Sequence, residues 1–510
     1  GMDQGKGLDI VPSLAVIDSK NFTPGTTDTN FEPSLDVYNR LTSTLNAALT
    51  INTDFSATEV DNRQVNLTRF NLFFPEKRNF FLNDAELFQF GRIGAGGFGN
   101  NNQASSRPSR ESARPFFSRR IGLDQAGAPV DLDYGGRISG RIGRWNIGTL
   151  AIRQDASGSV DATDLFVGRV SANVSEEASV GMIVTDGDPR SNLDNSVFGV
   201  DFRYLNTRLP GGRQLEADAW FQQSDTTGID TEDSAFGVAL KMPNNTGLRG
   251  GIGLKEIERN FNPAIGFVNR SNVRDMTVDI GYTKFFDSTY LQSAFIGLDA
   301  QRIESLDGGL QTEIFKFRLL ELENNSRDEL QLGFTTNEEV VVEPFTIYED
   351  QTRSVSVPAG RYSFDQADIS VETGGQRRFS GGIRYETGDF FGGSIETVNT
   401  EFTFNPGINF TMTLGYEWND VELPQGEFIS RLASINSAWE IRRNLYWINL
   451  IQYDNVSEVF GINTRVQWIP KAGQEAFIVL NHNLQDFDKD NTFNSTTSDV
   501  SVKFRYTLRF

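Results

Sequence analysis

The last residues of the chain alternate strictly between apolar and polar positions. In VSVKFRYTLRF (500–510), one face is apolar and consists of Val500, Val502, Phe504, Tyr506, Leu508 and Phe510. The other face is polar and consists of Ser501, Lys503, Arg505, Thr507 and Arg509. A period of two predicts a β-strand with one apolar and one polar face.

The same alternation recurs along the chain in INFTMTLGYEW (408–418), FGINTRVQW (460–468), VFGVDFRY (197–204) and MTVDIGY (276–282). Aromatic residues such as Tyr204, Tyr282 and Trp468 gather at strand ends, as in the interfacial girdles of membrane barrels. The polar faces carry Arg, Asp, Glu and Asn, whereas a soluble barrel fills its interior with apolar side chains. Lipid cannot hydrogen-bond backbone N–H and C=O groups, so each of them must pair within the sheet. The sheet must therefore close on itself. The sequence therefore predicts an all-β protein, a large closed antiparallel transmembrane β-barrel.

The final strand also resembles the assembly signal of bacterial outer-membrane barrels. We expect Phe504, Tyr506, Leu508 and Phe510 to form this signal, which the barrel assembly machinery would recognise. Outer-membrane lipid and lipopolysaccharide would surround the wall. The predicted location is the outer membrane of a Gram-negative bacterium.

The size of the barrel follows from strand spacing. At roughly 18 residues per strand and turn, the chain outside residues 55–130 predicts about 24 strands, within a range of about 20 to 26. A lumen of that width is commonly plugged. The strands are expected to start near residues 6, 32, 42, 131, 144, 163, 178, 195, 214, 234, 246, 275, 290, 309, 327, 362, 376, 391, 408, 426, 443, 457, 474 and 498.

Residues 55–130 break the alternation and divide the chain into first strands (1–54), this segment, and the remaining strands (131–510). Within it, RFNLFFPEKRNFFL (69–82) surrounds charged residues with Phe, and a Gly-, Asn- and Ser-rich stretch follows. A long solvated loop is one interpretation, but it would expose a large apolar patch. We favour an inward-folded plug, with Phe packed inside and cations paired to the lumen wall. The residues expected in the plug are Arg69, Phe73, Phe74, Glu76, Lys77, Arg78, Phe80, Phe81, Arg119 and Arg120.

Three stretches resemble signatures of the DUF5916 family. They are VNLTRFNLFFPEKRNFFLNDAELFQFG (65–91), FFSRRIG (116–122) and NFNPAIGFVNR (260–270). The resemblance implies an outer-membrane protein of Gram-negative bacteria with a barrel-like region. Members usually also carry an N-terminal domain similar to carbohydrate-binding module family 9. We expect this chain to lack that domain and to have a processed or truncated N-terminus, so no sugar-binding role is carried over.

Composition narrows the classes of function. The formal net charge is −21, with no Cys and one His. An acidic chain lacks the basic face that nucleic acid requires, and the absence of Cys excludes disulfides and thiolate metal sites. No apolar run reaches the ~18 residues of a membrane-spanning helix.

Candidate chemistry is sparse. His482 lies in VLNHNLQ, shares its strand phase with Ile478 and Leu480, and has no hydroxyl at neighbouring positions for a nucleophile, so we expect a structural role. Asp486, Asp488 and Asp490 alternate like the start of an EF-hand loop, but Asn491 stands at the Gly position and Thr497 where Glu is needed. A degenerate Ca²⁺ site is one interpretation and an acidic turn is the other. No other cofactor is expected.

Three functions remain open. The first is a plugged channel or transporter for a bulky solute such as an oligosaccharide or peptide. The second is a scaffold or secretion-type barrel that holds a partner protein, with the acidic loops and residues 335–361 as the binding surface. The third is an enzyme barrel, which the isolated His482 makes least favoured. We therefore predict that the chain is not an enzyme and that it carries solute through the outer membrane.

Overall fold

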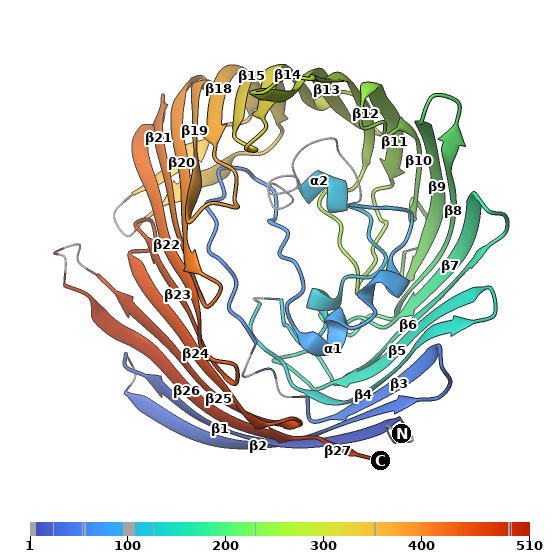
Figure 1. Ribbon diagram of the computed structural model, residues 1–510, viewed down its shortest axis with the longest axis vertical. Helices are drawn as coiled ribbons and strands as arrows, with labels where there is room; N and C mark the ends of the chain where they lie inside the picture. The colour runs from blue at the N-terminus through green and yellow to red at the C-terminus, as the bar shows by residue number, and fades with distance from the viewer. Residues whose placement is uncertain are drawn as a thin grey trace.

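The alternating segments form a closed wall of antiparallel strands in the computed structural model (Figure 1). The structure describes residues 7–23, 25–53, 55, 58–94, 108–125, 127–229, 231–350, 353–487, 490 and 492–510. β1 (Leu8–Asn21) pairs with β2 (Thr26–Arg40) on one side and with β26 (Asn494–Tyr506) on the other, which closes the ring. The two-residue β27 (Leu508–Arg509) continues the edge of β26 along β1. The predicted closed barrel is confirmed, with 24 strands in its wall.

The remaining strands follow one another around the ring, each paired with its sequence neighbour. They are β3 (Leu45–Ile51), β4 (Leu132–Ile142), β5 (Trp145–Gln154), β6 (Thr163–Asn173), β7 (Ala178–Asp186), β8 (Asn195–Leu209), β9 (Arg213–Thr226), β10 (Ser234–Met242), β11 (Gly247–Ile257), β12 (Val273–Phe285), β13 (Leu291–Ser305), β14 (Leu310–Asn324), β15 (Glu329–Val341), β18 (Gly360–Glu372), β19 (Phe379–Phe390), β20 (Gly393–Gly407), β21 (Phe410–Leu423), β22 (Gly426–Arg442), β23 (Leu445–Asp454), β24 (Val459–Lys471) and β25 (Gln474–Gln485). The largest displacement from the expected starts is at β2, expected near 32 and beginning at Thr26.

On the strands that alternate strictly, the apolar side chains face outward. Val502 and Phe504 of β26, for example, are 49% and 50% exposed, as expected for side chains that lipid would cover. Near the end of the barrel where the chain terminates, outward aromatic rings contact one another from strand to strand. This aromatic row runs through Phe379, Phe404, Phe410, Trp439 and Trp447, on β19 to β23. The residues of the expected assembly signal, Phe504, Tyr506, Leu508 and Phe510, are all exposed on this outer surface; their role in assembly stays a prediction.

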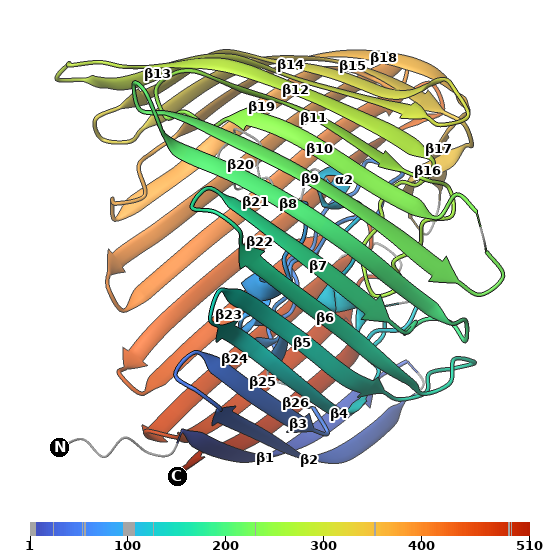
Figure 2. The same ribbon diagram turned by 90° about the vertical axis from the view of Figure 1, so that its right-hand side faces the viewer.

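The two rims of the barrel differ. Because Asp9 pairs with Arg509, the first and last strands meet at one end, here called the terminal rim. Connections at the terminal rim are short turns, such as 143–144 and 443–444. The opposite end, the far rim, carries the longest connections: 52–131, 258–272 and 342–359. Figure 2 shows the strands tilted between these rims.

The connection 52–131 is here called the insert, and its described residues fold into the ring instead of extending from it (Figure 1). It contains the short helices α1 (Asn79–Leu82), η1 (Ala85–Phe88), α2 (Pro108–Glu111) and η3 (Ser118–Arg120). Its two ends stay together, because β3 pairs directly with β4 and the Thr53 N–H donates to the Leu132 carbonyl at 3.1 Å. The insert therefore replaces a hairpin turn at the far rim. No helix within the described ranges is long and apolar enough to cross a membrane.

A second far-rim connection also packs on the wall. β16 (Phe345–Glu349) and β17 (Ser354–Val357) form a hairpin whose Ile347, Tyr348, Val355 and Val357 are buried. Tyr348 stacks on Phe428 of β22 with ring centroids 4.5 Å apart. Much of the 335–361 segment expected as a partner-binding surface is thus either wall strand or part of this second core.

Candidate functional site

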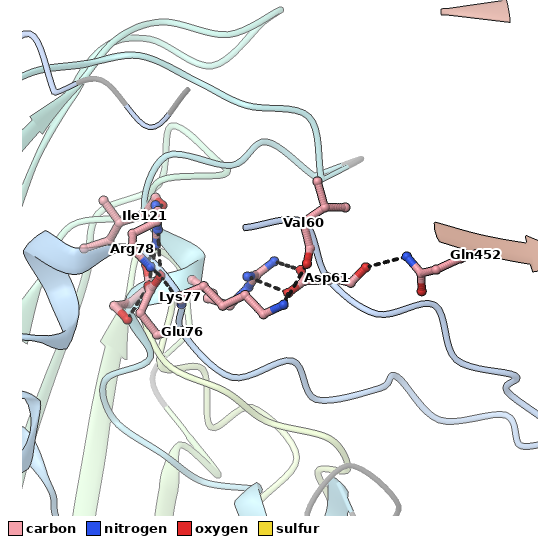
Figure 3. Close-up of polar contacts among 9 residues, drawn as sticks. Val60, Asp61, Glu76, Lys77, Arg78, Ile121 and Gln452 are labelled. Atoms are coloured by element: carbon pink, nitrogen blue, oxygen red, sulfur yellow. Dashed lines mark hydrogen bonds and ion pairs between the residues drawn. The ribbon is translucent and has the colours of Figure 1, made fainter. Parts of the chain in front are cut away.

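Glu76 and Arg78 form a buried polar hub at the centre of RFNLFFPEKRNFFL (Figure 3). Arg78 Nη2 lies 2.7 Å from Glu76 Oε2, and Arg78 Nε donates to Glu76 Oε1 at 2.9 Å. Arg78 also donates to the carbonyls of Ile121 and Ser118, both at 2.7 Å, while Ser118 Oγ donates to Glu76 at 2.6 Å. A buried ion pair is tolerated when the remaining donors and acceptors are satisfied. This hub therefore joins residues 76–78 to residues 118–121.

Opposing effects act on the Glu76 carboxyl. Burial alone would raise its pKa, but hydrogen bonds and attraction from Arg78, together with the Ser118 hydroxyl, lower it below the ordinary value. Glu76 is therefore ionised at neutral pH. The Arg78 guanidinium also stacks over Phe81, with 4.3 Å from its carbon to the ring centroid.

Phe side chains of the insert build an apolar interface with the barrel wall. Phe80, Phe81, Phe88 and Phe90 are each no more than 8% exposed. The wall contributes inward residues of β5 to β9 and beyond, including Leu150, Val167, Ile183, Val197 and Trp220. Phe73 stacks on Phe117 at 4.8 Å, whereas Phe74 is only partly buried. The burial of these Phe side chains holds the insert against the half of the wall that contains β5 to β9.

The three stretches that resembled DUF5916 signatures meet in space. Phe267, from the connection between β11 and β12, contacts both Phe73 and Phe117. The backbones of Arg114 and Phe267 exchange hydrogen bonds at 3.0 and 2.9 Å. A side chain at Gly266 would lie 2.1 Å from the Arg114 carbonyl, so this close approach requires glycine. The 258–272 connection therefore clamps the insert from the far rim.

The other cations expected in the plug each have a partner. Arg69 Nη2 lies 2.6 Å from Glu339 of β15, Arg119 pairs with Asp61, and Lys77 Nζ donates to the Val60 carbonyl at 2.7 Å. Arg120 Nε donates to the Gly266 carbonyl at 2.9 Å. Burial lowers the pKa of Arg120 to about 10, so its guanidinium stays charged at neutral pH.

Arg270 and Glu339 are site residues that sequence reasoning missed. The Arg270 guanidinium lies over the Phe70 ring at 3.5 Å and donates to Thr312 Oγ1 at 2.7 Å. Burial lowers the pKa of Arg270 to about 10, and Glu339 partly offsets the effect. The NFNPAIGFVNR stretch interrupts strand alternation, and this interruption was the available signal for a second inward-folded connection.

Residues 58–69 of the insert, here called the strap, cross to the opposite half of the wall through polar contacts. Glu59 lies 2.6 Å from Arg465 of β24. The Arg63 backbone N–H donates to Gln452 Oε1 at 2.7 Å, and the Arg63 guanidinium lies 3.6 Å from Asp454. Gln452 also donates to the Asp61 carbonyl at 3.4 Å (Figure 3). The strap is therefore held by ion pairs and hydrogen bonds.

Cavities remain between the insert and the wall. One of them, ≈ 670 Å³, lies between insert residues such as Phe55, Glu59 and Phe80 and the inward side chains of β2 and β24 to β26. Its charged lining comprises Asp36, Glu59, Glu76, Lys77, Arg465, Glu475, Lys503 and Arg505. A second of ≈ 310 Å³ lies between the strap, the β16–β17 hairpin and β22 to β23. The lumen is thus only partly filled.

The expected Ca²⁺ ligands lie in the connection between β25 and β26. The Asp490 N–H donates to Asp486 Oδ1 at 3.3 Å, as in an acidic turn, and Asp488 lies outside the described residues. Within the described ranges, no group of three or more His, Cys, Asp or Glu side chains could hold a metal ion.

His482 lies on β25 beside a hydroxyl that sequence reasoning missed. Its Nε2 is 3.2 Å from Ser495 Oγ of β26, across an irregularity in the strand register. Among the described residues, no polar group orients the other ring nitrogen, and the Phe22 ring instead contacts the imidazole edge-on. A Ser–His pair without such a group lacks part of a hydrolase site. That the chain is not an enzyme stays a prediction.

Fold and site together define a large β-barrel with an inward-folded insert. The family model of DUF5916, described as a domain of unknown function, matches residues 7–105. The resemblance inferred from the 65–91 stretch is thereby confirmed over that part of the chain. No curated protein matches the sequence.

Solved structures with a similar arrangement are distant in sequence. The siderophore receptor PirA of Pseudomonas aeruginosa has 7% identity and a TM-score of 0.42, with 98% of this chain and 80% of that chain covered. The outer-membrane ferripyoverdine receptor of the same species has 9% identity and a TM-score of 0.40, covering 98% and 72%. OccAB3 of Acinetobacter baumannii has 9% identity and a TM-score of 0.32, covering 99% of each chain. The ligands named for those proteins are theirs and are not assigned to this chain.

Proposed function

We propose that this protein is a gated outer-membrane channel that carries a polar solute through the partly filled lumen. The observation that carries the proposal is the ≈ 670 Å³ cavity, which separates the insert from the polar half of the wall. A barrel filled only for stability would be expected to pack this side as it packs the apolar side. Instead, charged side chains of the insert and the wall line an open space, which the Glu59–Arg465 ion pair bridges at one point.

The membrane location of the proposal is supported by the outer surface. Apolar side chains cover the strands, and the aromatic row from Phe379 to Trp447 follows the terminal rim. Bacterial barrels have short periplasmic turns and longer external loops. We therefore assign the terminal rim to the periplasm and the far rim, which carries the insert, to the cell exterior.

The test is single-channel conductance in a planar bilayer. Because β3 pairs directly with β4, residues 55–130 can be replaced by a short Gly-Ser turn without changing the wall register. We expect the intact protein to show a small or intermittent conductance and the deletion variant a large, steady one. A matched control replaces the 342–359 connection, also at the far rim, and should leave most of the block in place.

Two outcomes would count against the proposal. Equal conductance of the intact and deletion proteins would show that the insert does not restrict the lumen. A deletion protein that remains silent although correctly folded would show that the wall encloses no continuous path, and a scaffold role would then explain the barrel better.

A further inference from the structure

A groove crosses the lumen face of β9 to β14 beneath the Gly91–Gly94 turn of the insert. It encloses a cavity of ≈ 190 Å³ that the strap does not reach. The strand register places Ala239, Gly253 and Thr277 side by side on one rung of the sheet. Since these residues are small or lack a side chain, they form the floor of the groove.

Charged rungs border this floor on both sides. Toward the terminal rim, Lys241, Gly251, Asp279, Asp299 and Lys316 are consecutive cross-strand partners. Toward the far rim, Lys255 pairs with Asp275 in the register. The insert supplies Arg92 and Arg110 above. Alternating side-chain direction brings all these positions to the same face of the wall.

Most of these charges are already engaged by other residues. Lys255 Nζ lies 3.8 Å from Asp275 and donates to the Ser109 carbonyl of the insert at 2.6 Å. Asp299 lies 3.1 Å from Arg318. Arg92 lies 3.0 Å from Glu216. The groove is thus held in shape by contacts that do not involve a solute.

Asp279 is different. Among the described residues it has no hydrogen bond or ion pair, and it directly faces Asp299 on the neighbouring strand. Like charges in directly opposed positions are destabilising. Nearby, Asp218 has a side chain only 5% exposed, yet its Oδ1 lacks a hydrogen-bond partner; its closest cations lie at 3.7 and 3.8 Å. Two carboxylates therefore face the groove with unused acceptor capacity.

We propose that this groove is a subsite for the guanidinium or ammonium group of a basic amino acid or basic peptide side chain, with Asp279 as its ionic partner. Asp218 offers a second acceptor, and Arg110 stands where a solute carboxylate would be attracted. The cavity is smaller than the roughly 300–1,000 Å³ of drug-sized pockets, so it would take one such group of a larger solute. The inference rests on the proposed channel function and names its substrate class.

The experiment measures equilibrium binding to the full-length protein in detergent micelles, so it does not depend on transport. The probes are Nα-acetyl-L-arginine methyl ester and Nα-acetyl-L-citrulline methyl ester, which has nearly the same shape but carries no charge. Asp279→Asn is the test variant. Glu401→Gln is the control, because it removes the same charge from the lumen face of β20, outside the groove.

We expect the arginine ester to bind at least tenfold more tightly than the citrulline ester, as a charge-assisted hydrogen bond predicts. Asp279→Asn should abolish this preference, whereas Glu401→Gln should change it less than about twofold. Equal binding of the two esters to the wild-type protein would overturn the proposal. Equal losses in both variants would also overturn it, because they would indicate a general lumen potential instead of a site.

Folding of each variant is checked by the shift in gel mobility on heating that a closed barrel shows. Failure of this binding test with normal conductance would reject the subsite and leave the channel standing. Failure of the conductance test with normal binding would reject the channel instead.

Discussion

The insert contacts the two halves of the barrel wall through different chemistry. Against β5 to β9 it buries Phe80, Phe81, Phe88 and Phe90, and the Arg78 side chain beside them is only 9% exposed. Against β23 and β24 it places the strap, where the Arg63 side chain remains 31% exposed in its pairing with Asp454. One side is an extension of the hydrophobic core, and the other is a set of partly exposed polar contacts.

The magnitudes separate these two sides clearly. A buried Phe contributes about 1.5–3 kcal/mol, so the four Phe side chains together contribute on the order of 10 kcal/mol. A partly exposed ion pair contributes about 0–1 kcal/mol. Motion of the insert that opens a path should therefore begin at the strap, while the Phe-rich part stays in place.

The largest loss of stability is expected from a substitution in the Glu76–Arg78 hub. Arg78→Ala removes one partner of a buried, fully hydrogen-bonded pair and leaves Glu76 uncompensated, which should destabilise the insert locally by about 3–5 kcal/mol. Hydrogen exchange of residues 78–82 should accelerate accordingly. The wall strands of the same sample provide the control, since their protection should be unchanged. Unchanged exchange at 78–82 would show that the hub does not hold the insert.

A somewhat smaller effect is expected within the apolar interface. Phe81→Ala should cost about 3 kcal/mol through lost burial and the cavity left behind. The matched control is Phe74→Ala, because Phe74 is only partly buried and should cost less. Limited proteolysis of the folded barrel would report the difference. Equal protease sensitivity of the two variants would show that the buried Phe81 stabilises the insert no more than the partly buried Phe74 does.

The hub should also respond to pH. Because the folded-state pKa of Glu76 is lowered, its stabilising contribution is fully present above its unfolded value of about 4.3 and disappears as the pH falls through the folded value. The protection factors of residues 78–82, corrected for the intrinsic exchange rate at each pH, should therefore fall below about pH 4. Glu76→Gln should flatten this dependence. A pH profile that is the same in both proteins would assign the response to another group.

The smallest effect is expected at the strap. Arg63→Gln should cost less than about 1 kcal/mol and leave the Phe-rich part protected. Conductance records should nevertheless show more frequent openings, and high salt should act in the same direction by screening the pairs. Gating that is insensitive to both changes would place the moving element elsewhere.

Much of the wall could be predicted from alternation alone, because outward residues such as Val502 and Phe504 must be apolar while inward ones need not be. The insert was recognisable since its Phe and charged residues follow no period of two. Alternation assigns a face but no partner, however. It could not show that Phe267 packs on Phe73, that Glu339 receives Arg69, or that Ser495 reaches His482.

The position of the insert in the chain has a consequence for the order of folding. Its apolar contacts lie with residues between Ala48 and Ile303, most of which follow it in the chain, whereas its strap contacts reach Gln452 and Arg465. Contacts of short sequence separation form before distant ones. We therefore expect the Phe-rich core to condense on a half-built, still open sheet. The later strands, including β23 and β24, would then close the barrel around the folded insert. The last step would be the pairing of β26 with β1.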